Sequence, residues 1–110
     1  MPTPQDFFDI DIRVGTVVAA EPFTRAVKPS IRLEIDFGPD LGIKRSSAQL
    51  TVHYTPESLV GRQVVAVTNI GTRNIAGFTS EVLVLGAMPL AHEVVLLRLD
   101  HPVANGVRIG

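Results

Sequence analysis

The chain contains no cysteine and no tryptophan, and its net charge is small. Without cysteine, disulfide bonds, thiolate catalysis and cysteine-ligated metal sites are excluded. One tyrosine and five phenylalanines leave few aromatic faces on which nucleic-acid bases could stack, so a single-stranded DNA-binding role is not expected. The formal charge of −1, from 10 basic and 11 acidic residues, lacks the basic excess of domains that depend on phosphate contacts.

Long hydrophobic runs are also missing. No run approaches the roughly 20 residues that cross a bilayer, and residues 1–6 lack the basic and then apolar segments of a secretory signal. We therefore predict no membrane insertion and a cytoplasmic location. With 110 residues, 45% of them hydrophobic, residues 1–110 are expected to form a single domain with a buried core and, beyond it, a subunit interface.

Apolar periodicity predicts five main strands. They cover residues 10–19, 31–37, 43–52, 63–68 and 82–85. Gly15 is expected to mark a bend or bulge in the first strand, and Gly86 and Pro89 to close the fifth. Residues 22–29 and 69–79 are expected to be loops.

Two Thr-Pro pairs indicate short helices. Thr3 and Thr55 can each cap a helix whose first residue is a proline, Pro4 or Pro56. Gly61 can then take the left-handed conformation that closes the second helix.

The order of these elements indicates an all-β fold. Three strands, one short helix and two further strands are the sequence of a five-stranded Greek-key OB-fold barrel, with the helix between strands 3 and 4. Apolar runs at 94–97 and 107–109 would form a C-terminal extension.

Polar side chains lie next to apolar strands at Ser46-Ser47 and Ser80-Glu81. Two interpretations stay open: the hydroxyls satisfy strand ends and backbone groups, or they form a polar binding surface. No Gly-x-Ser-x-Gly segment is present, and a serine nucleophile would also need a base and an oxyanion pocket, so catalysis is not expected.

The remaining polar and apolar candidates are loop residues. Lys44-Arg45 and Arg73 are either solvated or the basic part of a binding surface. The apolar residues of the 69–79 segment, Ile70, Ile75 and Phe78, either fold onto the core or line a groove for a client's side chains. The histidines follow no metal-ligand spacing, so we expect structural or surface positions and no metal or cofactor.

Several segments together resemble the tRNA-binding domain family, which includes appendages of methionyl-tRNA synthetases. These segments are residues 11–17, 54–65, Asn69 and residues 80–83. Within that family the chain is similar to the CsaA-type export chaperones, through residues 45–51, 80–86 and Asn105-Gly106.

This resemblance implies a non-enzymatic OB-fold homodimer in the bacterial cytoplasm. Its partners would be unfolded or pre-secretory polypeptides and the secretion machinery, with tRNA as the alternative partner. The implied polypeptide-binding residues are Arg45, Ser47, Gln49, Asn69, Ile70, Arg73, Phe78 and Ser80. The implied dimer contacts are Phe7, Phe8, Val94, Leu96, Val107 and Ile109, so the C-terminal extension would serve dimerisation.

One departure from the family pattern favours the chaperone. Where tRNA-binding relatives commonly have Ser-Glu-Gly-Met, this chain has Ser-Glu-Val-Leu at 80–83, and the segment after Asn69 is not rich in lysine. A tRNA-binding surface would instead use Lys28, Arg32, Lys44, Arg45, Arg73 and Ser80.

Overall fold

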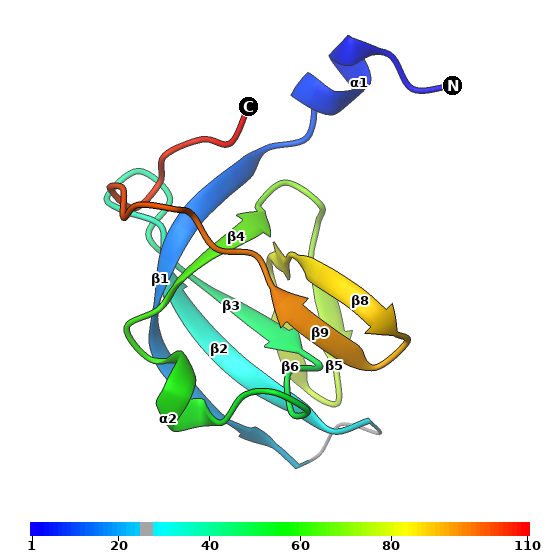
Figure 1. Ribbon diagram of the computed structural model, residues 1–110, viewed down its shortest axis with the longest axis vertical. Coiled ribbons are helices and arrows are strands. Elements are labelled where there is room, and N and C mark those ends of the chain that lie inside the picture. Colours follow the sequence, from blue (N-terminus) through cyan, green and yellow to red (C-terminus); the bar gives the residue numbers. More distant parts are fainter. Residues whose placement is uncertain (25–27) are drawn as a thin grey trace.

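A curled sheet of five antiparallel strands forms the body of the protein (Figure 1). In the computed structural model, which describes residues 1–24 and 28–110, the strand order is β3-β2-β1-β4-β7. The bounds are β1 Ile12–Phe23, β2 Ser30–Asp36, β3 Ile43–Ala48, β4 Gln63–Val67 and β7 Leu83–Val84. Of the loop predicted at 22–29, residues 25–27 lie outside the described ones, and β1 extends to Phe23.

The inner face of the sheet carries the core, as the alternation in β2 predicts. Ile31, Leu33 and Ile35 of β2 and the following Phe37 are all buried, whereas Glu34 between them is exposed. Side chains alternate across a strand, so one face of β2 is apolar and the other meets solvent.

The first strand departs from the prediction at its bend. Its pairing with β2 shifts register between Val17 and Ala19, not at Gly15. Gly15 is instead a point of close packing, since a Cβ there would lie 2.6 Å from Ile35 Cγ2 and 2.8 Å from Phe37 Cδ1. A side chain at this position would meet the side chains of Ile35 and Phe37, so the glycine lets them pack against β1.

The predicted helix between the third and fourth strands is α2, Pro56–Leu59. Thr55 caps it by accepting a hydrogen bond from the Ser58 amide, and Gly61 follows in the left-handed region at φ 90°. Leu59 is fully buried, so the helix closes one end of the core.

The segment predicted as a loop at 69–79 contains a hairpin. Strands β5, Arg73–Ile75, and β6, Phe78–Ser80, pair through a two-residue turn. Both turn residues have positive φ, Ala76 at 49° and Gly77 at 86°, the geometry that matches strand twist. The prediction failed because three-residue strands show no periodicity and alanine does not signal such a turn.

A second hairpin follows where the fifth strand was expected to end. Strands β8, Gly86–Leu90, and β9, Glu93–Leu96, pair with each other. Pro89 does not stop β8, because the strand lies at an edge of this two-stranded sheet. The third strand, by contrast, ends at Ala48 rather than at Val52.

A seam of hydrogen bonds joins β3 to the segment 80–82 and closes the barrel. The buried Ser46 hydroxyl donates to the Val82 carbonyl at 3.0 Å. The Glu81 amide donates to the Arg45 carbonyl at 2.7 Å, and the Glu81 carboxylate accepts from the Arg45 amide at 3.1 Å. These bonds satisfy backbone groups that would otherwise be left open at the sheet edges.

Ser80 extends the seam toward the end of β3. Its buried hydroxyl accepts a hydrogen bond from the Ser47 amide at 3.3 Å. For Ser46 and Ser80, the structure therefore supports the first of the two interpretations, in which hydroxyls satisfy backbone groups.

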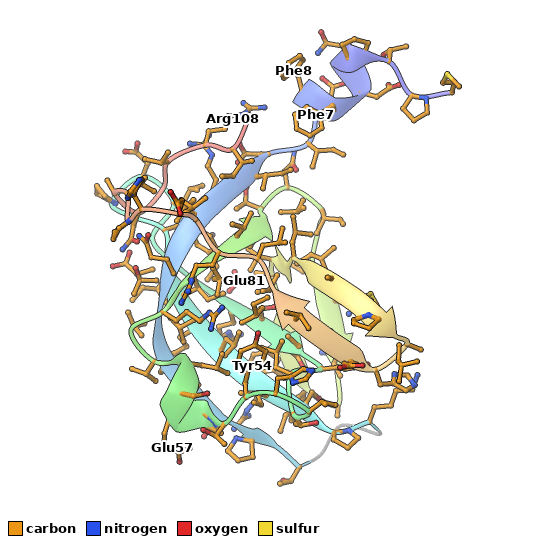
Figure 2. All side chains as sticks on the ribbon, viewed as in Figure 1. Phe7, Phe8, Tyr54, Glu57, Glu81 and Arg108 are labelled. Carbon is orange, nitrogen blue, oxygen red and sulfur yellow. The ribbon has the colours of Figure 1, made fainter. Side chains whose placement is uncertain are left out.

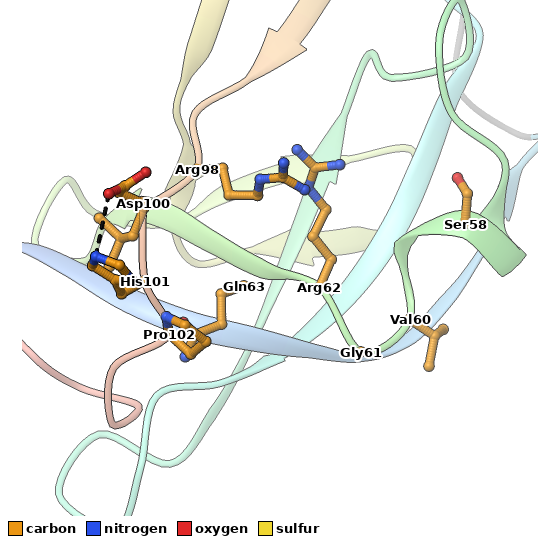
Figure 3. A pocket seen from close by; sticks show the side chains of 10 residues that line it. Ser58, Val60, Gly61, Arg62, Gln63, Arg98, Asp100, His101 and Pro102 are labelled. Carbon is orange, nitrogen blue, oxygen red and sulfur yellow. Dashed lines mark ion pairs between the residues drawn. The ribbon is translucent and has the colours of Figure 1, made fainter.

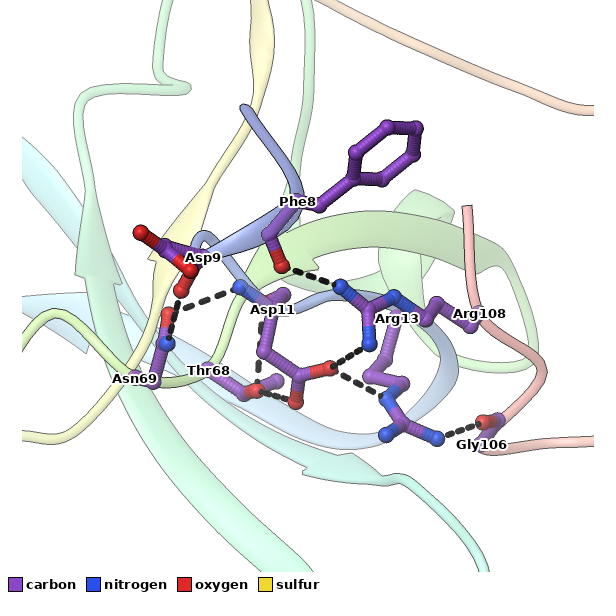
Figure 4. A network of polar contacts seen from close by, with 8 residues as sticks. All are labelled: Phe8, Asp9, Asp11, Arg13, Thr68, Asn69, Gly106 and Arg108. Atoms are coloured by element: carbon purple, nitrogen blue, oxygen red, sulfur yellow. Dashed lines mark hydrogen bonds and ion pairs between the residues drawn. The ribbon is translucent and has the colours of Figure 1, made fainter. Parts of the chain in front are cut away.

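The N-terminal helix α1, Pro4–Phe8, extends away from the barrel (Figure 1). Thr3 caps it through the Asp6 amide, as predicted, yet the helix has no buried residue. Asn69 holds the chain that follows by accepting from the Asp11 amide and donating to the Asp9 carbonyl, each at 2.8 Å (Figure 4).

Asp11 joins the two termini to the sheet (Figure 4). Its carboxylate accepts hydrogen bonds from Arg13 Nε at 2.8 Å and from the Thr68 hydroxyl, and Arg108 Nη1 lies 3.9 Å away. Arg108 also donates to the Phe8 carbonyl at 2.7 Å. Burial by itself raises the pKa of Asp11, but the Thr68 hydroxyl and the two guanidinium groups outweigh it and hold that pKa below its ordinary value.

The lowered pKa of Asp11 makes part of the stability depend on pH. Such a carboxylate stabilises the fold above its unfolded pKa, about 3.9, and this contribution is lost as pH falls through the lower folded value. We expect Asp11→Asn to lower the free energy of unfolding at neutral pH by about 1–2 kcal/mol and to weaken the loss of stability in acid. Urea unfolding at neutral and acidic pH measures both effects. Asp40→Asn, in an exposed turn, is the control, and equal effects of the two substitutions would contradict this role.

Candidate functional site

A groove of about 550 Å³ lies where the end of β3 and strand β7 meet the two hairpins. Its lining comes from β2, β3 and β7 of the main sheet, from β5 and from the β8–β9 hairpin, together with the residues next to these strands. It is lined by Lys28, Ser30, Ser47, Ala48, Gln49, Arg73, Ile75, Leu83, Val84, Leu85, Gly86, Met88 and Val94. The groove thus combines residues from three separate sheets.

Most polar residues of the groove were indicated by the sequence, and Ser30 is the exception. Ser47, Gln49 and Arg73, from the predicted polypeptide-binding set, all line it, and Lys28 joins them from the alternative set. Gln49 is positioned by a 2.9 Å contact between its Oε1 and His92 Nδ1. Within the described residues, neither Lys28 nor Arg73 has a carboxylate within 4.0 Å.

The apolar lining was largely missed from the sequence. Leu83 is 43% exposed and Met88 is 63% exposed, although both are large hydrophobic residues. Leu83 follows the buried Val82 in an apolar run, so periodicity alone places both in a core strand. Only the position of the β8–β9 hairpin shows that Leu83 and Met88 face a groove.

Phe78 and Arg45 lie at a different place, on a smaller pocket of about 300 Å³ that Arg32 also lines. Phe78 is only 8% exposed and its ring packs against Phe23, with centroids 5.4 Å apart. The Arg45 and Arg32 guanidinium carbons lie 5.1 and 5.6 Å from the Phe78 centroid, which is cation–π distance. Phe78 therefore supports two arginines and offers little free area.

The other predicted binding residues are distributed over the molecule. Ser80 lies in the seam, and Asn69 uses its side chain to hold the N-terminal segment. Ile70 is 59% exposed but does not line the groove, and Lys44 lies on β3 opposite Ile35. The structure thus does not bring the predicted tRNA-binding residues into one pocket.

The residues predicted at a dimer interface have different exposures. Phe7, Phe8 and Val107 are exposed, and Ile109 packs partly against a second apolar cluster. Leu96, by contrast, is buried in the barrel core, and Val94 lines the groove.

The histidines occupy separate places. His53 Nε2 lies 2.7 Å from Glu93 Oε2, and His101 Nε2 lies 3.3 Å from Asp100 Oδ2. In residues 1–24 and 28–110, no group of three or more histidine and acidic side chains could hold a metal ion. No helix in the same residues is both long and apolar enough to cross a membrane.

Residues 12–108 match the family described as a putative tRNA binding domain. Two solved structures are similar over their whole length. The chaperone CsaA from Bacillus anthracis is 53% identical with a TM-score of 0.95, covering 100% of this chain and 99% of that one. The CsaA chaperone protein from Picrophilus torridus is 42% identical with a TM-score of 0.91, covering 100% of both chains. The chain belongs to the CsaA-type branch of the tRNA-binding domain family.

Membership of this family confirms the predicted OB-type barrel and the resemblance read from the sequence. The matched family is not a catalytic one. A methionine–tRNA ligase from Porphyromonas gingivalis is 41% identical over 83 residues, which is 76% of this chain but 12% of the ligase. The chain therefore spans a small appended part of that enzyme.

The packing of Phe78 leads to a stability prediction. We expect Phe78→Leu to lower the free energy of unfolding by about 1–2 kcal/mol, because the smaller side chain leaves a gap and removes the ring beneath two arginines. Ile70→Ala, at an exposed site, should change stability by less than about 0.5 kcal/mol. Denaturant unfolding compares them, and a Phe78 variant as stable as the wild type would show that the ring is not structural.

Proposed function

We propose that the protein is a non-enzymatic chaperone that holds extended polypeptide segments in the groove. The observation that supports this most directly is the composition of the groove, in which exposed apolar side chains lie together with Ser47, Gln49 and Arg73. An unfolded client presents apolar side chains together with unpaired backbone groups. The groove has a matching partner for each of these.

Apolar burial supplies the attraction in this proposal. Leu83 and Met88 are exposed in the free protein, so covering them with a client's side chains removes apolar surface from water. A volume of about 550 Å³ suits a few side chains and no folded domain. Clients would therefore be recognised through short extended segments.

Hydrogen bonding gives the client its direction. The Gln49 amide and the Ser47 hydroxyl can pair with backbone groups, and the Arg73 guanidinium can donate to carbonyl oxygens or pair with an acidic side chain. The sequence has no Gly-x-x-x-x-Gly-Lys segment for nucleotide phosphates. Release would then be passive and would follow client concentration.

The clients would be unfolded or export-destined polypeptides, and the protein would meet them in the cytoplasm before secretion. Similarity to two structures named as CsaA chaperones supports the chaperone part of this proposal. We also propose that residues 1–110 form a single domain.

Groove variants test this function. We expect Met88→Ala to weaken binding of a labelled unstructured peptide about tenfold, because an apolar contact is lost, and Arg73→Gln to weaken it several-fold. Val52→Ala removes an exposed apolar side chain outside the groove and should leave affinity unchanged. Fluorescence anisotropy with the folded variants measures all three. Equal affinities of wild type and both groove variants would refute the proposal.

Binding of tRNA is the second candidate function, favoured by the family match and by Lys28 and Arg73 at the groove, which pair with no carboxylate among residues 1–24 and 28–110. Phosphate contacts make affinity fall steeply with salt, whereas apolar peptide binding depends on salt only weakly. A tRNA complex that weakens with salt and is displaced by the peptide would place both ligands on one surface. No tRNA binding at low salt would remove this candidate.

We also propose that the protein is a homodimer through α1 and the surface around the C-terminus. A five-residue helix with no buried residue is not stable by itself in water, so α1 needs a surface to pack on. Its two phenylalanines are exposed, Phe8 by 55%. Nearby, Leu85, Leu99 and Ile109 pack on a second apolar cluster of the barrel and are themselves only partly buried. A second copy of the chain would bury both surfaces.

Light scattering coupled to gel filtration tests the dimer. Wild type is expected at twice the mass of the chain, and the double variant Phe7→Ser with Phe8→Ser at the mass of one chain, because the helix loses its apolar anchors. Ile43→Ser changes an exposed apolar residue at the start of β3 and should remain dimeric. A monomeric wild type, or a dimeric double variant, would contradict the proposed interface.

A further inference from the structure

A second pocket, of about 880 Å³, lies between the end of α2 and the C-terminal segment (Figure 3). Residues 58–63 form one side of it and residues 98–102 the other. It shares no lining residue with the groove. The polypeptide-binding proposal therefore leaves it without a role.

Arg62 is the better fixed of two arginines that line this pocket. Its guanidinium carbon lies 5.2 Å from the centroid of the Tyr54 ring, and the Tyr54 hydroxyl accepts a hydrogen bond from the Leu96 amide at 3.0 Å. Its Nε is buried and has no hydrogen-bond partner in the part of the chain that the structure describes. The ring keeps the guanidinium group in a fixed orientation, and its Nε–H remains an unused hydrogen-bond donor. Leaving a buried donor unpaired costs folding free energy.

Arg98 reaches into the same pocket from the opposite side. Figure 3 shows the side chains of Arg62 and Arg98 extending toward the same region. Among the described residues, no carboxylate lies within 4.0 Å of either guanidinium group. The one acidic residue that lines the pocket is Asp100, which is paired with His101 at 3.3 Å.

The neighbouring polar groups already have partners in the fold. The Gln63 amide donates to the Val103 carbonyl at 2.6 Å, and the Ser58 hydroxyl donates to the Thr55 carbonyl at 2.9 Å. The unpaired groups of the pocket are thus the two guanidinium ions. Two like charges that share a pocket repel each other where no carboxylate pairs with either of them, and an anion between them relieves that repulsion.

We propose that this pocket binds a phosphate group, with Arg62 and Arg98 as the two residues that hold it. Planar guanidinium groups donate parallel hydrogen bonds to phosphate oxygens, and two of them oppose a dianion better than one. The volume around the arginines leaves room for a small organic group attached to the phosphate. Free phosphate and a mononucleotide share this chemistry, and the experiment separates them.

NMR titration of the labelled full chain tests the site, with inorganic phosphate and adenosine monophosphate as separate probes. Saturable shifts are expected at the Arg98 amide and at the Arg62 Nε–H group. Arg98→Gln, at an exposed position, should weaken binding about tenfold, since one charge-assisted contact is lost. Arg62→Lys keeps the charge and should weaken binding several-fold.

Lys44→Gln is the control, because it removes one positive charge from β3 and none from this pocket or from the groove. Its phosphate affinity should equal that of the wild type. Tighter binding of the nucleotide than of phosphate would identify a phosphorylated organic ligand, and equal binding would identify phosphate itself. Absence of saturation with both probes, or equal weakening in Arg98→Gln and Lys44→Gln, would overturn the proposal. Failure of peptide binding would not affect it, since the two sites have separate residues.

Discussion

The hydrogen-bonded seam between β3 and the segment 80–82 is the constraint on which the site depends. Hydrogen bonds of the Ser46 hydroxyl and of the Glu81 backbone and side chain join β3, the edge strand of the main sheet, to the segment that precedes β7. These bonds hold β3 beside the segment that leads into β7. Because residues of both strands line the groove, the bonds also fix the position of that lining. The polar residues that stand out beside apolar strands in the sequence are thus used to close the barrel.

The groove forms because the seam is flanked in the sequence by two hairpins that do not continue the main sheet. The β5–β6 hairpin precedes the seam and the β8–β9 hairpin follows β7 directly. Their side chains Ile75 and Met88 cannot enter the barrel, whose interior is filled by residues such as Ile35 and Leu59. They line a surface groove instead. An OB barrel with short flanking hairpins therefore gains exposed apolar surface without a larger core.

Strong local signals explain which parts of the fold could be predicted. Period-two alternation predicted β2, and the Thr-Pro start with Gly61 predicted α2. Both patterns depend only on residues that are close together in the sequence. The hairpin turn at Ala76 has no such signal, and Pro89 signals a strand end unless the edge position is known. Short edge hairpins depend on tertiary contacts, so the sequence alone did not reveal them.

The candidate site could be predicted mainly in its polar part, with Ile75 as the one apolar lining residue that the sequence had offered for a groove. Ser47, Gln49 and Arg73 were indicated by residue type and by family resemblance, and the structure brings them together. Ser80 carries the same kind of hydroxyl but is buried in the seam. Residue type does not distinguish a binding hydroxyl from one that satisfies backbone, and hydrophobicity does not distinguish an exposed Leu83 from a buried Val82. Both distinctions require the three-dimensional arrangement.

Photo-crosslinking of an unstructured peptide that carries a photoreactive phenylalanine, mapped by mass spectrometry, tests the central claim most directly. If the groove holds extended polypeptide, crosslinks will concentrate on Ile75, Leu83 and Met88 and will disappear when excess unlabelled peptide is added. Crosslinks spread evenly over the surface, or concentrated on residues 58–63 and 98–102, would contradict the account.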